Sequence, residues 1–524
     1  MARACRKHEV RNVNSTTKKR ILLVNPLPSL SLYSWPEVGD ITGHPAYIMN
    51  IAPPTLAAMT PAEVEIAVVD EAVEPVSFDG DWDLVGVTGY LTQMRRMCEI
   101  ADEFRRRGRL VAIGGPYASL SPHVVRPHAD ILFIGEAEAT WPAFLEDFLG
   151  GHWQAEYRST ELVDLQTSPL PALNSLRPGA YELGVVQTSR GCPFECEFCD
   201  VIIYLGRKQR HKTPSRVVDE LEQMYTAGYR SIFLSDDNFT ANRQRAAETM
   251  LAVRDWNQRL PEPVALYTQL SIDVTRDRDL PLLDLCAEAG LKQAFVGIET
   301  PNPDALREVK KRQNLRSDLV ADVHRIQSRG IMVQAGMITG FDSDTLESFG
   351  HQFAFLQEAG IPMVLLAMLN ALDGTPLQRR LATENRLKPL LLADAALDTN
   401  VIPKQMTSRQ LLKGTVWLLN KLYAPRNFLQ RLQVFADQLP VDRAHATPQT
   451  DAPFWGRVAG SYATLGSDLR DVPVEAVKLF RGRDTHGLRT ALVFYRSAVG
   501  VLRRWGVWDP GQGDLAQPDF RSVA

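Results

Sequence analysis

The 524-residue chain has no hydrophobic run long enough to cross a bilayer. Its longest candidate, Ile361 to Leu372, falls well short of the roughly 20 residues required. Net charge is also small, at −4 with a pI near 6.2, so no strong field draws the whole protein to nucleic acid or anionic lipid. We therefore expect no transmembrane segment and no nucleic-acid partner. A content of 45% hydrophobic and 23% charged residues is typical of a soluble globular protein.

Cysteine is scarce, with six residues in the chain, and internal repeats and low-complexity blocks are missing. Residues 1–19 are polar and basic without the apolar core of a secretory signal, so we predict a loose tail and a cytoplasmic protein. In a reducing compartment, clustered thiols indicate metal or redox chemistry more often than disulfides. Cys5, Cys98 and Cys286 are scattered, as expected of a tail residue or small buried side chains. The other three cysteines lie within eight residues.

Residues 20–153 alternate short apolar segments with amphipathic ones, which predicts a first domain with strands at 21–26, 64–70, 84–90, 110–115 and 131–136. Strands that are apolar on both faces and joined by helices form a parallel sheet with both sides covered, here of the flavodoxin-like kind. Such sheets bind ligands at the carboxyl ends of their strands, and glycine there lets a backbone approach a ligand closely. The candidate ligand-binding edge comprises Gly89, Gly114, Gly115, Pro116, Gly135 and Glu136.

A proline-containing linker is predicted at 154–181, followed by a second βα rhythm at 182–380. Six consecutive βα units predict a partial (β/α)6 barrel with its chemistry at the carboxyl ends of the strands. Residues 381–510 are expected to form a mainly helical domain, and 511–524 a second loose tail. The barrel strands are expected near 183–188, 231–235, 264–270, 292–298, 331–338 and 362–369. Its helices are expected near 214–227, 242–257, 281–289, 303–328 and 344–359.

The clustered cysteines occur in SRGCPFECEFCD, residues 189–200, directly after the first predicted barrel strand. Three thiolates on one loop can hold three irons of a [4Fe-4S] cluster and leave the fourth iron without a protein ligand. Zinc usually takes four protein ligands from two paired motifs, and here only the lone His211 is nearby. Inert buried cysteines do not suit a segment with two Glu and a Pro, which is typical of a loop. We therefore predict a cluster on Cys192, Cys196 and Cys199.

The motif is similar to the C-x3-C-x-aromatic-C signature of the radical S-adenosylmethionine (SAM) superfamily. The resemblance implies that the open iron binds SAM, which is cleaved reductively to a 5′-deoxyadenosyl radical, with Phe198 near the adenine. It extends through LSDDNF (234–239), GIET (297–300), AGMITGFD (335–342) and NALDGTPL (370–377), each after its predicted strand. These segments imply SAM contacts from Asp236 or Asp237 to the amino group, Glu299 beside Gly297 to the ribose, and Gly340 near the adenine.

The first domain resembles the cobalamin-binding domain of cobalamin-dependent radical SAM enzymes. The matching segments imply cobalamin contacts from Asp70, Thr88, Gly89, Tyr90, Gly114, Gly115, Pro116, Gly135 and Glu136. The D-x-H-x-x-G motif of many cobalamin proteins is missing, because NPLPSLSLYSWPEVG follows the first strand without a histidine. The resemblance therefore implies cobalt with no histidine beneath it, and the alternative is a degenerate domain that binds nothing. The segment LYAPRNFLQRL (422–432) resembles the branch of hopanoid C-2 methylases and bacteriochlorophyll side-chain methylases.

These resemblances imply a methyltransferase that moves a methyl group from SAM via methylcobalamin to an unactivated carbon of a small-molecule or lipid-like substrate. Such an enzyme needs an external one-electron reductant such as flavodoxin or ferredoxin, and a lipid substrate would bring peripheral membrane association. Open alternatives are a cobalamin-dependent cyclase, oxidase or rearrangement enzyme, and an iron–sulfur or cobalamin sensor. A methylthiotransferase is disfavoured, because its first domain carries cluster cysteines and here that domain offers only Cys98.

Overall fold

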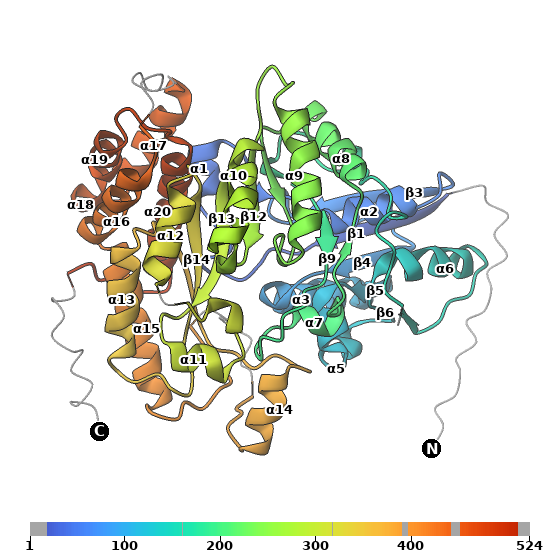
Figure 1. Cartoon of the computed structure of the whole chain (residues 1–524). Coiled ribbons are helices and arrows are strands. Elements are labelled where there is room, and N and C mark those ends of the chain that lie inside the picture. Colours follow the sequence, from blue (N-terminus) through green and yellow to red (C-terminus); the bar gives the residue numbers. More distant parts are fainter. Residues whose placement is uncertain (1–17, 160, 317, 390–396, 442–450, 512–524) are drawn as a thin grey trace.

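The computed structural model describes residues 18–159, 161–316, 318–389, 397–441 and 451–511. The molecule contains two parallel sheets that lie side by side. A helical C-terminal region (red in Figure 1) packs at the end of the molecule far from the first sheet. The predicted tails at 1–19 and 511–524 lie outside the described residues, apart from 18, 19 and 511.

The first sheet has the strand order β3-β1-β4-β5-β6-β7, and all neighbours are parallel. Successive residues of β1 point to opposite faces, so Leu22 and Val24 join the apolar core under α3, while Ile21 and Leu23 join the core under α6. Both faces are therefore covered, as predicted. The strands are β1 (Lys19–Asn25), β3 (Val64–Asp70), β4 (Leu84–Thr88), β5 (Leu110–Gly114), β6 (Ile131–Ile134) and β7 (Glu156–Arg158). Its helices are α2 (Ala52–Met59), α3 (Met94–Arg106), α4 (Pro116–Leu120), α5 (Pro122–Val125) and α6 (Ala137–Leu149).

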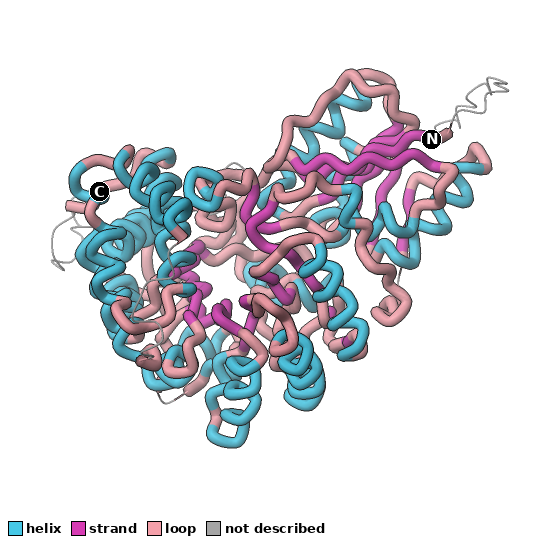
Figure 2. The backbone as a smooth tube through the Cα atoms, turned by 90° about the horizontal axis from the view of Figure 1, so that it is seen from above, coloured by secondary structure: helices cyan, strands magenta, loops and turns pink. Residues whose placement is uncertain are grey.

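The second sheet has the order β15-β14-β13-β12-β11-β8-β2 and curls into an open half-barrel, seen from above in Figure 2. The six predicted strands are confirmed in sequence order, each parallel to the next. They are β8 (Tyr181–Val186), β11 (Ser231–Leu234), β12 (Ala265–Leu270), β13 (Leu291–Glu299), β14 (Met332–Thr339) and β15 (Met363–Met368). The half-barrel helices are α8 (Pro214–Thr226), α9 (Arg243–Asn257), α10 (Leu280–Glu288), α11 (Pro303–Glu308), α12 (Leu319–Gln327), α13 (Ser348–Glu358) and α14 (Pro376–Thr383).

The edge strand β2 (Ala46–Ile48) was not anticipated. It comes from the segment assigned to the first domain, yet it pairs with β8 of the half-barrel. The helix before it, α1 (Val38–Thr42), packs against C-terminal helices, and Trp35 stacks on Tyr47 at 3.9 Å between ring centroids. Three strand residues carry no recognisable periodicity, so the sequence could not show that this segment pairs with the half-barrel. The domain limits as a whole stay a prediction.

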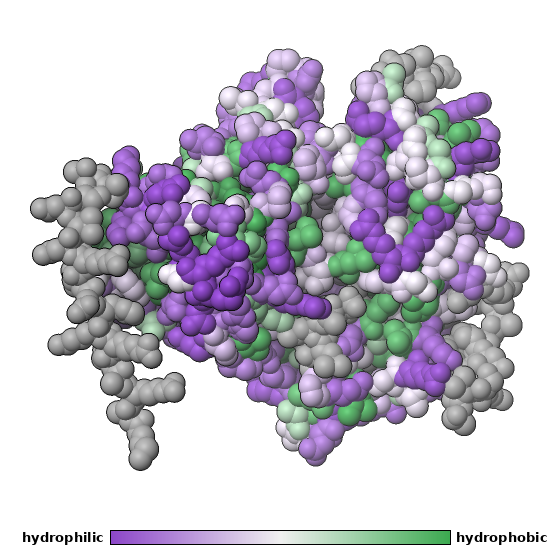
Figure 3. Space-filling view, turned by 180° about the vertical axis from the view of Figure 1, so that it is seen from behind, coloured by the Kyte–Doolittle hydropathy of each residue, from purple (hydrophilic) through white to green (hydrophobic). Residues whose placement is uncertain are grey.

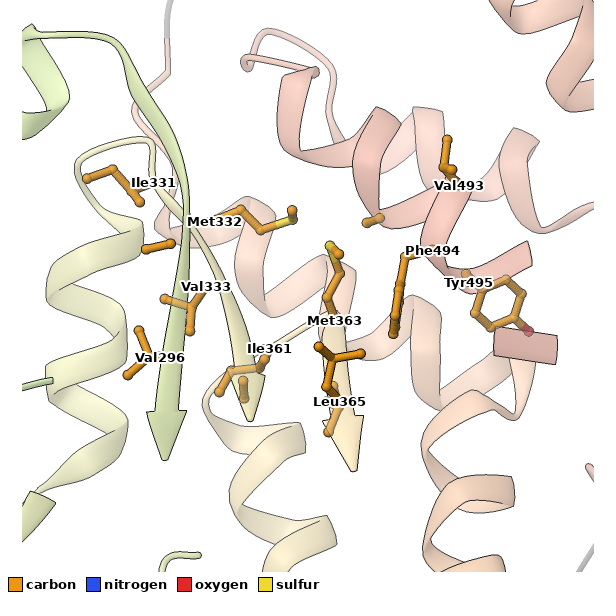
Figure 4. Packing of buried hydrophobic residues seen from close by; sticks show 14 of the residues in the cluster. Val296, Ile331, Met332, Val333, Ile361, Met363, Leu365, Val493, Phe494 and Tyr495 are labelled. Carbon is orange, nitrogen blue, oxygen red and sulfur yellow. The ribbon is translucent and has the colours of Figure 1, made fainter. Parts of the chain in front are cut away.

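The C-terminal region consists of helices that cover β14 and β15. In Figure 4, Phe494 of α20 points toward Met363 and Leu365 of β15, and all three are buried. Among the described helices, none has the length and apolarity to cross a bilayer. Polar residues dominate the face seen in Figure 3, with apolar ones in separate green areas. The helices are α15 (Ser408–Tyr423), α16 (Pro425–Gln438), α17 (Ala452–Ala463), α18 (Ser467–Arg470), α19 (Val472–Leu479) and α20 (His486–Arg504).

Arg431 joins this region to the half-barrel from a fully buried position on α16. Its guanidinium donates to the carbonyl oxygens of Ile361 (2.8 Å) and Leu422 (2.7 Å) and to Oε1 of Gln357 (2.6 Å). Burial lowers the pKa of Arg431 to about 10, which leaves it charged at neutral pH. The side chain thus satisfies three buried acceptors on separate elements.

We expect Arg431→Met to lower the free energy of unfolding by about 3 kcal/mol, because those acceptors lose their donors. Thermal unfolding of the protein without cofactors would show this as a lower Tm. Arg426→Met, an exposed change on the same helix, should shift stability by no more than about 0.5 kcal/mol. Equal Tm values for the two variants would contradict this role.

Candidate active site

The cysteine loop, residues 191–199, lies between β9 (Ser189–Arg190) and α7 (Val201–Tyr204). β9 pairs with β10 (Arg210–His211), which closes the loop into a hairpin. Gly191 begins the loop with φ of +90°, and a Cβ there would lie 2.9 Å from the carbonyl oxygen of Lys208 and 3.0 Å from that of Gly206. Only glycine fits this close approach, so the loop is held tightly against its returning strand.

All three loop cysteines are free thiols; Cys196 is buried, and Cys192 and Cys199 are half-buried. Burial raises the pKa of Cys192 to about 11 and also raises that of Cys199, so these two thiols are neutral unless a cation compensates. Among the described residues, no three His, Cys, Asp or Glu side chains gather around one metal-ion position. Three sulfur donors spread along one loop suit a multi-iron cluster, in which each thiolate binds its own iron. The donor set therefore fits a [4Fe-4S] cluster with one iron free of protein.

Two carboxylates after β11 support the start of this loop. Asp236 accepts hydrogen bonds from the Thr188 amide (3.0 Å), the Thr188 hydroxyl (2.5 Å) and the Ser189 amide. Asp237 Oδ2 accepts from the Gly191 amide at 2.9 Å. Burial raises the pKa of each to about 6. Their hydrogen bonds position the cysteine loop, and a direct contact of either residue with SAM stays a prediction.

Glu299 ends β13, where the register with β14 shifts. Its φ of +66° is unusual for a residue with a side chain, and its buried carboxylate forms an ion pair with Lys311. A Cβ on Gly297 would lie 2.4 Å from Oε1 of Glu299 and 2.7 Å from Nζ of Lys311. A glycine at 297 therefore makes room for this ion pair, which lies at the carboxyl end of the half-barrel.

Lys311 belongs to a segment that the sequence prediction assigned to one continuous helix at 303–328. This prediction was wrong, because the helix stops at Glu308 and resumes at Leu319. Lys310 between them has φ of +58°, which turns the chain inward. Gln313 then donates from Nε2 to the Cys196 sulfur at 3.5 Å. The sequence has no glycine or proline at this break. The polar run KKRQN (310–314) interrupts the spacing of apolar residues expected of a helix and is the one signal of the break.

Phe198 and Gly340 meet at the same end of the half-barrel. The Phe198 ring lies 6.5 Å from that of Phe341, and the Lys311 ammonium lies 5.8 Å from the Phe198 centroid. Gly340 has φ of +103°, and a Cβ there would lie 2.8 Å from Cδ2 of Leu411 on α15. The structure thus brings together the predicted SAM-binding positions, whose individual contacts stay predictions.

The glycine-rich edge of the first sheet contains close backbone approaches. Gly115 has φ of +91°, and a Cβ there would lie 2.3 Å from Oγ1 of Thr88 and 3.3 Å from the Gly89 nitrogen. Gly135 also has φ of +91°, and its Cβ would lie 2.7 Å from the Ser159 carbonyl oxygen. Strand-end loops bare of side chains suit a large flat ligand such as cobalamin. Gly114 ends β5 and Pro116 begins α4 at the same edge.

Tyr90 follows Gly89 at this edge and is 55% exposed. Burial of its hydroxyl group raises its pKa, and the carboxylates of Asp237 and Asp200 raise it further. Asp237 binds the start of the cysteine loop, and Asp200 follows its last cysteine. Tyr90 therefore lies near both ends of the cysteine loop.

Two acidic residues predicted at the cobalamin edge bind protein groups, and their contacts with cobalamin stay predictions. Asp70 accepts from the hydroxyl of Tyr181 on β8 at 3.1 Å. Glu136 pairs with Arg190 and Arg210, each at 2.7 Å, and all three side chains are at most 15% exposed. Arg190 also binds Glu138 at 2.6 Å. Since Arg190 lies two residues before Cys192, these pairs tie the first sheet to the cysteine loop.

Comparisons with known proteins give families for two parts of the chain. Residues 186–356 match the radical SAM superfamily, and residues 375–463 match a domain of unknown function (DUF4070). The chain is 36% identical over 419 residues to "Uncharacterized methyltransferase sll1242" of Synechocystis sp., covering 79% of this chain and 77% of the relative. It is 33% identical over 382 residues to hopanoid C-2 methylase of Rhodopseudomonas palustris, covering 71% of each.

A solved structure shares the whole architecture. The radical S-adenosylmethionine methyltransferase TsrM from Kitasatospora setae, determined with cobalamin and a [4Fe-4S] cluster bound, gives a TM-score of 0.61 at 17% identity. The match covers 88% of this chain and 99% of TsrM. The predicted order of a parallel sheet, a partial barrel and a helical C-terminal region is thereby confirmed.

Proposed function

The chain belongs to the radical SAM methyltransferase family that includes hopanoid C-2 methylase, and we propose that it is a cobalamin-dependent C-methyltransferase. It would transfer a methyl group to an unactivated carbon of a small-molecule or lipid-like substrate. The observation that carries the proposal is the placement of the bare glycine edge of the first sheet against the cysteine loop, linked through Arg190. One site can then serve both cofactors.

When bound, the cluster with SAM supplies a 5′-deoxyadenosyl radical and cobalamin supplies the methyl group. The chain's own residues bind and orient them. Cys192, Cys196 and Cys199 would hold the cluster, and the Asp237 carboxylate fixes the backbone where their loop starts. Gly115 and Gly135 allow the close backbone approach to Thr88 and Ser159 that shapes the edge proposed for cobalamin. An external one-electron reductant, such as flavodoxin or ferredoxin, would deliver the electron.

The substrate would lie against the segment between β1 and β2. Three large apolar side chains from the end of β1 through β2 are exposed: Leu27 (49%), Tyr33 (49%) and Ile48, the last residue of β2 (40%). Burial of the Tyr33 hydroxyl raises its pKa, and the Glu299 carboxylate adds to this effect, which supports a place for Tyr33 near the proposed SAM site. An apolar surface beside the proposed radical source favours a substrate with a hydrocarbon or ring surface.

Product stoichiometry tests the proposal. Turnover should give 5′-deoxyadenosine, S-adenosylhomocysteine and methylated product in matching amounts, since one SAM supplies the radical and another the methyl group. Deoxyadenosine without homocysteine product would instead indicate a cyclase, oxidase or rearrangement enzyme. No SAM cleavage by protein with a complete cluster would indicate a sensor.

We expect Glu136→Gln to uncouple radical formation from methyl transfer. Arg190 and Arg210 both lose a buried carboxylate partner, so the first sheet is held less firmly against the cysteine loop. The ratio of methylated product to deoxyadenosine should fall roughly tenfold, as expected from losing about 1.4 kcal/mol of positioning. Glu65→Gln, which removes only an exposed pair with Arg20, is the matched control. A ratio equal to that of the control would refute the coupling.

A further inference from the structure

The segment 309–314 contacts the cysteine loop, and no part of the proposed chemistry accounts for it. The Val309 carbonyl oxygen accepts a hydrogen bond from the Glu197 amide at 2.9 Å, between the second and third cysteines. At the other end, Asn314 Nδ2 donates to the carbonyl oxygens of Gly297 (2.7 Å) and Ile298 (3.0 Å). The segment therefore bridges the cysteine loop and the end of β13.

Two side chains of this bridge point at the proposed cofactors. Gln313 is buried, and its Nε2 lies 3.5 Å from the Cys196 sulfur, within range of an N–H···S hydrogen bond. Lys311 pairs with the buried Glu299 and lies over the Phe198 ring. Burial disfavours its charge, but Glu299 and the Cys196 sulfur more than compensate and hold the pKa of Lys311 above its usual value. The site thus receives one hydrogen bond to sulfur and one buried ammonium group that is paired with the Glu299 carboxylate.

We propose that Gln313 and Lys311 are tuning residues that raise the reduction potential of the cluster. This rests on the proposed function, since it requires a cluster on the three cysteines. Reduction adds negative charge that spreads over the sulfur ligands. A donor to a thiolate sulfur and a nearby cation therefore stabilise the reduced state more than the oxidised one. The effect matters because SAM cleavage begins with a cluster that is difficult to reduce.

Their neighbours offer a matched control. Arg312 lies between the two residues, carries the same charge as Lys311 and is exposed to solvent. Charge that is exposed in this way is screened by water and salt. Arg312→Met thus removes one positive charge from the same turn without changing the contacts at Cys196 or Glu299.

The test is an EPR-monitored redox titration of anaerobically reconstituted full-length protein: wild type, Gln313→Leu, Lys311→Met and Arg312→Met. Iron and sulfide content first establish that each carries a complete cluster. At the wild-type midpoint potential, the ratio of reduced to oxidised cluster should fall about threefold in Gln313→Leu and Lys311→Met, which corresponds to ~30 mV for one electron. Arg312→Met should leave the ratio unchanged.

The outcomes separate this inference from the proposed function. A wild-type protein that assembles no four-iron cluster would overturn the proposed function and the inference together. Complete clusters with unchanged midpoints in Gln313→Leu and Lys311→Met would overturn the tuning role alone. A variant that fails to assemble its cluster would also count against the tuning role, because the replaced residue would then be needed to hold the cluster rather than to set its reduction potential.

Discussion

Cys196→Ala should reduce SAM cleavage by at least about a thousandfold, because three ligands that hold one cluster act as a unit. Cys196 is the buried member of the three, and its sulfur accepts the Gln313 hydrogen bond. The small alanine side chain leaves the backbone of the loop free to keep its contacts. The measurement is 5′-deoxyadenosine formed per chain under reducing conditions, together with iron content.

Cys286→Ala is the control for this loss. Cys286 is fully buried within α10, and burial raises its pKa to about 12, as expected of an inert thiol in an apolar core. Its replacement should cost some stability but leave cluster content and SAM cleavage per folded chain unchanged. Cleavage that persists in Cys196→Ala, or that is lost equally in Cys286→Ala, would contradict a cluster on the loop.

Gly115→Ala should greatly reduce cobalamin binding while leaving the cluster in place. The added methyl group would lie 2.3 Å from the Thr88 hydroxyl, at a φ of +91° that side chains rarely adopt. The loops at the sheet edge must then move apart, and we expect this movement to prevent close contact between their backbone and the ligand. We expect at least a tenfold loss of bound cobalamin and about a hundredfold loss of methylated product.

Gly108→Ala in the same domain separates ligand binding from backbone strain. Gly108 also has a positive φ, of +78°, but nothing lies within 4 Å of an added Cβ there, and it follows the end of α3 rather than a strand. Both variants thus bear the cost of an unfavourable φ, about 1 kcal/mol. If both bind cobalamin as well as the wild type, the glycine edge is not its site.

The strand prediction succeeded where the sequence pattern reflects burial on both faces. Consecutive apolar residues such as those of β1 indicate a sheet covered by helices, and the cysteine spacing placed the candidate cluster on one loop. Local patterns did not show β2 in the half-barrel, because three residues pair with a strand more than 130 positions away. They also missed the turn at Lys310. After this turn, Lys311 pairs with Glu299 and Gln313 binds the Cys196 sulfur, in a segment that helix propensity alone would continue as a helix.

Glu136 has partners in the structure that its strand-end position in the sequence did not show. The sequence placed it at the cobalamin edge by resemblance, and its carboxylate binds Arg190 and Arg210 at 2.7 Å each. Those partners lie 54 and 74 residues along the chain, beyond any local pattern. Asp236 is similar, since its carboxylate accepts three hydrogen bonds from Thr188 and Ser189. Both residues position the cysteine loop, and a direct contact of either with a cofactor stays a prediction.

The central claim is that three thiolates leave one iron open, and that SAM binds there. EPR of the reduced, reconstituted protein with and without SAM tests this most directly. We expect about four irons per chain and a signal of the reduced cluster whose g-values change when SAM is added. One zinc per chain without four-iron absorbance would contradict this claim, and so would a complete cluster whose EPR signal does not change when SAM is added.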